Sequence, residues 1–316
     1  MWVYIARRLM WAPFLLLAVS FVTFTMGLVV PGDPIEARLG TKANPEAVER
    51  IREQEGLNDP ILLQYYRYVT NAVRGDFGES LTRPGTTVWE LLSKKIWISS
   101  QLSFASLLVS VGLGIPLGVY AAFKQGTWRD IATVSCTLVG MSMPVFLTAP
   151  GLIIVFGLWM GILPVQGWGG FLDLHIVLPS VAMGIPGIAI VARLTRSSTL
   201  EVITQDYVRT ARAKGLPEGT IRTRHVLRNA LIPVVTALGM SLAGLLVSSV
   251  IVERFFGIPG AGQLAIESFF SRDYPVITAL VLLGGTAFFL ANLLVDLAYP
   301  LLDPRIRLDG NSTNAG

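Results

Sequence analysis

Apolar residues in this 316-residue chain gather in long runs. Most runs are long enough to cross the roughly 30 Å hydrocarbon core of a bilayer as helices that rise about 1.5 Å per residue. A buried helix of a soluble protein fits poorly, because a polar face usually interrupts it within about 20 residues. The pattern therefore predicts an all-α membrane protein with six transmembrane helices. Six runs lack Asp, Glu, Lys and Arg: Leu9–Val30, Ile96–Phe123, Ile131–Leu172, Leu174–Ala192, Ala230–Val252 and Tyr274–Val295.

The basic residues between the runs predict how the chain is threaded. Short cytosolic loops are enriched in Lys and Arg, whereas long translocated segments such as 31–95 escape this rule. With both termini in the cytosol, the two short outer loops hold only Arg254 and Arg272. The cytosolic segments then hold Arg7, Arg8, Lys124, Arg129, eight basic residues between Arg193 and Arg228, Arg305 and Arg307.

Two runs allow more than one interpretation. The first follows two arginines as a signal peptide would, but it is longer than the usual roughly 7–15 residues and offers no convincing cleavage site, so we expect an uncleaved span. The third, Ile131–Leu172, has room for one span or a tight pair. A pair would place the eight basic residues between Arg193 and Arg228 outside. We therefore expect one span to about Trp159 and an outer loop over Gly161–Asp173.

The segment between the first two runs predicts a small extracytoplasmic helical insertion. Two short helices are expected over Asn44–Gln54 and Pro60–Arg74, with Asn44 as a cap, Pro45 in the first turn and Gly56 as a stop. Tyrosines there suit core or interfacial anchoring better than a ligand site. The residues expected to pack the two helices together are Leu57, Leu62, Tyr65, Tyr66 and Tyr68.

Composition removes several classes of function. Only 15% of residues are charged, against about a quarter in soluble domains. A single cysteine, Cys136, and two distant histidines, His175 and His225, form no metal-ligand spacing. No Gly-x-x-x-x-Gly-Lys-Ser/Thr, His-Glu-x-x-His or Gly-x-Ser-x-Gly occurs, so the chain carries no phosphate loop or familiar catalytic motif. The pI near 9.3 reflects inward-facing loop charges, and binding of nucleic acid is not expected.

The most informative segment lies in the predicted cytosolic loop 193–229. Its sequence is Asp206-Tyr-Val-Arg-Thr-Ala-Arg-Ala-Lys-Gly215-Leu-Pro, followed by His225-Val-Leu-Arg-Asn-Ala-Leu-Ile-Pro233. Gly215 suits the left-handed conformation that ends a helix, and the proline after Leu216 suits the first turn of the next helix. The small residues Ala211, Ala213 and Gly215 would let another protein approach the backbone closely. A loop known only by its charge would instead be expected to rest on anionic headgroups.

The order of residues in this loop resembles the EAA motif of the permease subunits of ABC importers, where a short coupling helix sits in a groove of a cytosolic ATPase. Arg209-Thr-Ala stands where Glu-Ala-Ala would, and Gly215 is the motif glycine. Arg228 replaces the motif proline, and a proline follows only at Pro233. The same departures from the motif are typical of the B-type permeases of peptide and nickel importers, which this loop resembles. The resemblance assigns ATPase coupling to Tyr207, Arg209, Thr210, Ala211, Ala213, Lys214, Gly215, Leu216, His225, Arg228, Asn229 and Pro233.

The resemblance extends over nearly the whole chain and implies a type I ABC importer permease fold in the cytoplasmic membrane. It implies four regions: 1–30 with the first span, the insertion 31–95, the permease core 96–300 and a cytosolic tail 301–316. The implied partners are a second, C-type permease, two cytosolic ABC ATPases that bind ATP and magnesium, an extracytoplasmic binding protein and membrane lipid. The similar stretches are Arg7-Arg8, Pro31-Gly-Asp-Pro34, Leu57 and Asp59-Pro60 before Gln64-Tyr65, Gly75-Asp-Phe-Gly78, Arg272-Asp-Tyr-Pro275, and Asp296 with Leu302-Asp-Pro-Arg305.

The pore and its substrate are less well specified by sequence. Glycine and proline interrupt several runs, and Pro144, Pro186 and the intramembrane Asp296 are candidates to line a pathway. Helix kinking, close helix packing and snorkelling explain the same residues. Peptide is the substrate class implied by the resemblance, with nickel chelates or sugars as alternatives. A self-powered secondary transporter is disfavoured, because neither inverted repeats nor midplane charges are evident.

Overall fold

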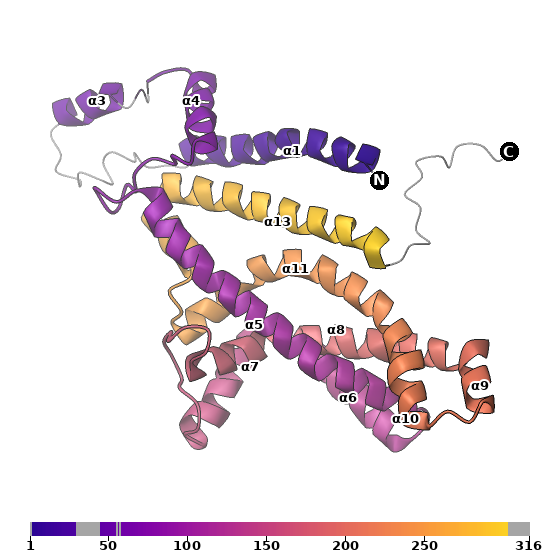
Figure 1. Ribbon diagram of the computed structural model, residues 1–316. Helices are drawn as coiled ribbons and strands as arrows, with labels where there is room; N and C mark the ends of the chain where they lie inside the picture. The colour runs from indigo at the N-terminus through magenta and orange to yellow at the C-terminus, as the bar shows by residue number, and fades with distance from the viewer. Residues whose placement is uncertain (1, 30–44, 55, 57, 303–316) are drawn as a thin grey trace. The chain divides into compact units, whose positions relative to one another are not determined.

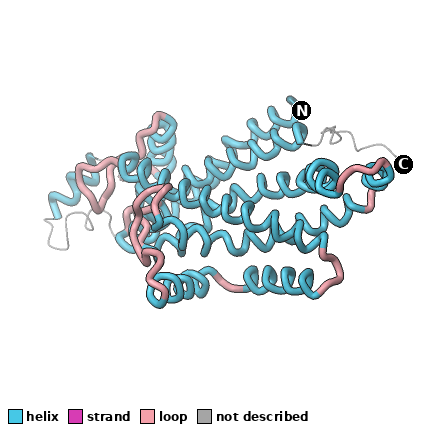
Figure 2. The backbone as a smooth tube through the Cα atoms, turned by 60° about the horizontal axis from the view of Figure 1, so that its bottom comes forward, coloured by secondary structure: helices cyan, strands magenta, loops and turns pink. Residues whose placement is uncertain are grey.

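The computed structural model describes residues 2–29, 45–54, 56 and 58–302, and nearly all of them are helical (Figures 1 and 2). Within these residues the only extended pairing is an isolated antiparallel bridge between Glu79 and Thr87. The predicted cap Asn44, Leu57, the Pro31–Pro34 stretch and the tail after Leu302 lie outside the described residues. The chain divides into two compact units, one of Ser100–Ile258 with Leu290 onward and the other of Trp2–Ser99 with Pro259–Phe289.

The helices follow the apolar runs closely, together with short helices that join them. In chain order they are α1 (Trp2–Val29), α3 (Pro45–Gln54), α4 (Ile61–Val73), α5 (Val88–Phe123), α6 (Trp128–Ser142), α7 (Val145–Leu152), a π-helical segment (Ile153–Trp159), a 3-10 turn (Leu174–Ile176), α8 (Val177–Ile203), α9 (Asp206–Ala213), α10 (Glu218–Thr220), a second π-helical segment (Ile221–Leu227), α11 (Arg228–Phe256), α12 (Ala261–Ser271) and α13 (Tyr274–Leu302). The two short helices predicted before the second span are therefore confirmed as α3 and α4.

Among the described residues, four helical stretches are long and apolar enough to cross a membrane: Met10–Gly27, Val88–Phe123, Leu174–Ile203 and Tyr274–Leu293. A bent helix pair raises that number to as many as five. The 29-residue helix α11 also contains the predicted run Ala230–Val252. An all-helical membrane protein with several spans is thus confirmed, whereas the exact number of six stays a prediction.

The region expected to form one span, from Ile131 to about Trp159, is not a single straight helix, and its crossing of the membrane as one bent span stays a prediction. Helix α6 ends at Ser142, and the next helical stretch, Val145–Trp159, is bent from it by 105°. Proline lacks a backbone N–H and disfavours the helical conformation in the residue before it. Met143, just before Pro144, accordingly adopts an extended backbone with ψ 118°. The hydropathy of the run gave no sign of this break, because both arms are apolar and free of Asp, Glu, Lys and Arg beyond Asp130.

The larger unit is built around α8, which packs against α11 and α6. Small residues let α5 approach α8 closely. A Cβ atom added at Gly114 would lie 2.7 Å from the Val191 Cβ, and one added at Gly184 would lie 3.1 Å from the Ser106 carbonyl oxygen. The Ser110 hydroxyl donates to the Gly184 carbonyl at 3.0 Å. Close helix packing therefore explains the glycines of these two interrupted runs.

Gly118→Val is expected to disrupt this packing. A Cβ at Gly118 would collide with the Ala192 carbonyl oxygen and lie 2.7 Å from the Thr195 Cβ, so backbone must move, at a cost of about 1–3 kcal/mol. Gly112→Val is the matched control, because among the described residues nothing lies within 4 Å of its added Cβ. The thermal stability of the two purified variants checks this. Equal loss of stability in both would contradict the packing described here.

The smaller unit has its own apolar core, which joins the start of α5 to α12 and α13. Phe77, just before α5, stacks on Trp89 with ring centroids 6.1 Å apart. Two of the tyrosines expected to pack the short helices together, Tyr65 and Tyr68, contact α1, and the outer helical insertion stays a prediction. Buried side chains of the core are Phe77, Val88, Leu92, Leu264, Val276 and Ala279.

The buried carboxylate of Asp273, at the junction of α12 and α13, holds the loop that precedes α5. It accepts hydrogen bonds from the hydroxyls of Ser80 and Thr82 and from the backbone N–H of Leu81 at 3.1 Å. Arg272, just before it, ends α12 in the left-handed conformation with φ 57°. Segments almost two hundred residues apart are therefore fixed to each other by one side chain.

Asp273→Ala is expected to release this loop. The change leaves buried donors without an acceptor, at a cost of about 1–3 kcal/mol for each group left unpaired. Asp76→Ala is the control, since the Asp76 carboxylate accepts a local hydrogen bond from Gly78 in the same turn. Limited proteolysis of the 79–87 segment is the readout, with faster cleavage in Asp273→Ala. Unchanged cleavage would show that the loop is held by other contacts.

Candidate ATPase-coupling loop

The segment from Asp206 to Arg228 folds as a compact helical hairpin on a small apolar base. Helix α9 places Val208 and Ala211 on one face, at the spacing of neighbours on a helix surface. The returning π-helical segment supplies Ile221 and Val226, and all four side chains are buried together. The last residues of α8 and Phe123 at the end of α5 pack against this base. The hairpin is therefore packed firmly against the ends of α5 and α8.

The turn of the hairpin is a Schellman motif centred on Gly215. The Gly215 N–H donates to the Arg212 carbonyl at 2.9 Å, and the Leu216 N–H donates to the Ala211 carbonyl at 3.3 Å. Gly215 has φ 74°, in the left-handed region where a side chain is strained. Among the described residues, nothing lies within 4 Å of a Cβ added there. The predicted helix stop is confirmed, and Pro217 caps the next helix instead of lying in its first turn.

Polar side chains tie the two arms of the hairpin together. The Asn229 amide donates to the Tyr207 hydroxyl at 2.9 Å and to the His225 carbonyl at 3.0 Å. The Arg212 guanidinium donates to the Glu218 carboxylate at 3.0 Å across the turn. Three residues that the resemblance assigns to ATPase coupling, Tyr207, His225 and Asn229, thus connect α9 to the start of α11 and hold the shape of the loop.

The outer surface of the hairpin carries the remaining candidates. Ala211, which was expected at the docking corner, is only 5% exposed and belongs to the apolar base, so its side chain is not part of the outer surface. Pro233 lies in the interior of α11, just beyond the hairpin. The exposed residues among the candidates are Arg209, Thr210, Ala213, Lys214, Gly215, Leu216 and Arg228, besides Tyr207 at the base of the hairpin. Three of them, Arg209, Lys214 and Arg228, are basic.

An ion pair that the sequence did not reveal lies where α6 begins, beside the stem of the hairpin. Arg196 of α8 donates from Nε and Nη2 to the two carboxylate oxygens of Asp130, each at 2.7 Å. The Gly126 N–H also donates to Asp130, at 3.1 Å. The Asp130 side chain is 6% exposed and that of Arg196 27%. The pair therefore fixes the turn between α5 and α6 to the helix that leads into α9.

Comparison with known proteins agrees with this arrangement. A family described as "Binding-protein-dependent transport system inner membrane component" matches residues 114–308, which include the hairpin. A second description, for the N-terminal part of such membrane components, matches residues 1–86. The chain belongs to this family. It is a multi-pass inner membrane permease of a binding-protein-dependent transport system.

Curated relatives and a solved structure are similar to this permease over most of its length. The probable peptide ABC transporter permease protein y4tP of Sinorhizobium fredii is 40% identical over 314 residues, 97% of this chain and 100% of that protein. The dipeptide transport system permease DppB of Bacillus subtilis is 40% identical over 294 residues, 93% of this chain and 94% of that protein. An inward-facing MetNI methionine ABC transporter chain superposes with a TM-score of 0.56 at 20% identity, over 67% of this chain and 96% of that one. At that identity the likeness is one of fold.

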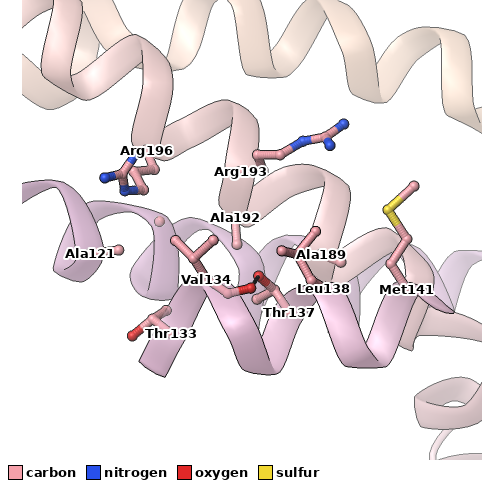
Figure 3. Close-up of a pocket in the computed structure, with 11 residues that line it drawn as sticks. Ala121, Thr133, Val134, Thr137, Leu138, Met141, Ala189, Ala192, Arg193 and Arg196 are labelled. Carbon is pink, nitrogen blue, oxygen red and sulfur yellow. Dashed lines mark hydrogen bonds between the residues drawn. The ribbon is translucent and has the colours of Figure 1, made fainter. Parts of the chain in front are cut away.

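The candidates for pore-lining residues have different outcomes. Pro144 is exposed and marks the bend between α6 and α7, and Pro186 lies in the interior of α8. Asp296 falls within α13, but its side chain is outside the described residues. A cavity between α6 and α8, beside Arg193 and Arg196, has a volume of only about 20 Å³ (Figure 3). Since one water needs at least roughly 10–15 Å³, this cavity of the permease does not accommodate a peptide.

Proposed function

We propose that this permease is the membrane-spanning subunit of an ABC importer for peptides. The feature that carries the proposal is the hairpin turn at Gly215, which is exposed and backed by a buried base that connects it to α5 and α8. An exposed turn of this kind can enter a groove in another protein. Because its base packs on α5 and α8, a movement of the turn would be passed on to these membrane helices. The peptide substrate is proposed from the relatives named as peptide and dipeptide permeases.

In this proposal the chain itself hydrolyses no ATP. Two cytosolic ATPases bind ATP and magnesium, close on each other, and move the hairpin through their contact with its outer surface. A second permease completes the pore, and an extracytoplasmic binding protein delivers the peptide. The hairpin and both termini then lie on the cytosolic side, as the distribution of basic residues predicts.

Transport by the reconstituted complex tests the function. The complex isolated through a tag on this chain is placed in proteoliposomes with ATP inside or outside, and uptake of a labelled dipeptide is followed with its binding protein present. We expect uptake only when ATP is on the side of the hairpin. Uptake that is driven by an ion gradient and is indifferent to ATP would refute the proposal and favour a secondary transporter.

A further inference from the structure

Helix α4, in the connection after α1, exposes an apolar face that no described residue covers. Leu62 is 70% exposed, Tyr66 65% and Val73 84%. Residues four and eleven positions after Leu62 fall within the same stripe of a helix with 3.6 residues per turn. Exposure of an apolar stripe of this kind to water is unfavourable. The question is therefore whether the stripe faces water or the membrane.

The contacts of α4 place it against the side of α1. The Tyr65 hydroxyl donates to the Leu17 carbonyl at 2.7 Å and lies 2.8 Å from the Ser20 hydroxyl. Aromatic contacts join Tyr65 to Phe21 at 5.0 Å and Tyr68 to Phe24 at 5.6 Å between ring centroids. These aromatic and hydroxyl contacts come from a single turn of α4, and Figure 1 shows α4 running across α1 near its C-terminal end.

These contacts set the depth of α4 in the bilayer. The apolar span of α1 covers Met10–Gly27, so Ser20 and Leu17 precede its end by seven and ten residues. At about 1.5 Å per residue, Tyr65 meets α1 roughly 10–15 Å below the end of the span. One side chain cannot bridge that depth from outside the hydrocarbon core. The axis of α4 therefore lies beside the outer half of the α1 span, and because α4 runs across α1 (Figure 1), it is oriented roughly along the plane of the bilayer.

The sides of α4 match that position. At about 100° per residue, the face that packs on α1, with Tyr65 and Tyr68, lies about a quarter turn from the exposed apolar stripe. The polar side chains lie opposite that stripe. There Arg67 forms an ion pair with Asp59 at 2.7 Å, and Gln64 donates to the Asp59 carbonyl at 2.7 Å. A helix lying beside a span needs these three sides, one for the span, one for acyl chains and one for water.

We infer that the face formed by Leu62, Tyr66 and Val73 binds phospholipid acyl chains, so that α4 is an interfacial helix anchored to α1. Lipid is favoured over a protein partner because α4 packs on a side of α1 that is itself apolar and exposed, where Leu17 is 41% and Phe14 63% exposed. Tyrosine at the boundary also suits an interfacial helix, whose apolar side typically enters about 5–10 Å. The inference requires only that α1 spans the membrane, not that the cargo is a peptide.

Site-directed fluorescence quenching tests this inference in the intact complex. The native thiol is removed by Cys136→Ser, and a single Leu62→Cys is labelled with bimane in phosphatidylglycerol and phosphatidylcholine nanodiscs. The matched control is Asn71→Cys, on the polar side of the same helix. Doxyl-labelled phospholipid probes contact with acyl chains, and iodide probes contact with water. Tyr66→Cys gives the same readout if Leu62→Cys does not accumulate.

We expect doxyl lipid to quench the label at Leu62 several-fold more than the label at Asn71, and iodide to show the reverse order. Equal quenching of the two positions by iodide would overturn the inference. Protection of Leu62 from both quenchers would also overturn it, because a protein would then cover this face. Failure of dipeptide uptake in the same preparation would contradict the proposed function but not the inferred contact of α4 with lipid.

Discussion

Import driven by ATP is expected to be lost when Gly215 is replaced by arginine. The glycine has φ 74° at the exposed turn of the hairpin, and a non-glycine residue in that region costs roughly 1–2 kcal/mol. The long side chain would also project from the outer surface that we propose to enter the ATPase. Binding of peptide to the external binding protein should persist, because no part of that step involves the hairpin. Uptake and peptide-stimulated ATP hydrolysis in proteoliposomes measure the effect.

Gly126→Arg separates docking from backbone strain and charge. Gly126 also has a positive φ, 76°, and also has nothing within 4 Å of an added Cβ among the described residues. It lies in the turn between α5 and α6, which is predicted to face the cytosol as well. We expect Gly126→Arg to keep most of the uptake, and Gly215→Asn, which tolerates the left-handed conformation, to be intermediate. Full coupled hydrolysis in Gly215→Arg would show that the docking assignment is wrong.

Arg196→Ala is expected to cause the largest loss of stability. It would leave the Asp130 carboxylate buried without the two hydrogen bonds that it accepts from the guanidinium. Removal of one partner from a buried ion pair costs about 3–5 kcal/mol, because the remaining charge is uncompensated. The turn at Gly126 and the stem of the hairpin should loosen together. Thermal unfolding of the purified complex and its yield after solubilisation measure the loss.

Arg193→Ala is the matched control for that experiment. Arg193 lies almost one turn earlier on α8, borders the same small cavity and is exposed (Figure 3). We expect little change in stability there, whereas the exchange Asp130→Arg with Arg196→Asp should recover part of the loss. Equal destabilisation by Arg193→Ala and Arg196→Ala would show that the ion pair contributes nothing specific.

The ion pair also shows why sequence analysis reached the helices but missed this contact. Apolar runs predict helices because burial in lipid demands internal hydrogen bonding, and this rule needs no knowledge of neighbours. Asp130 immediately precedes one apolar run, and a charge at such a border normally marks the end of a span. The pairing with Arg196, 66 residues away, depends on which helices pack together. One sequence does not contain that information.

Backbone geometry explains the other differences. The bend at Pro144 was not predicted because hydropathy is a sum over side chains and is blind to a missing backbone N–H. At the hairpin, the glycine stop was predicted correctly, since the left-handed conformation has a direct residue preference. The position of Ala211 was not, because smallness suits a buried contact and an exposed docking surface equally well. Only the packing of Val208, Ile221 and Val226 distinguishes the two.

Photo-cross-linking from the hairpin tests the central claim most directly. A photoreactive amino acid at Leu216, on the outer surface of the hairpin, is compared with one at Leu172, which is 95% exposed in the predicted outer loop. After irradiation of whole cells, we expect an adduct of Leu216 with an ATP-binding protein that carries a phosphate loop, and none from Leu172. An ATPase adduct from Leu172, or none from Leu216 in cells that import peptide, would contradict the assignment of this hairpin as the coupling element.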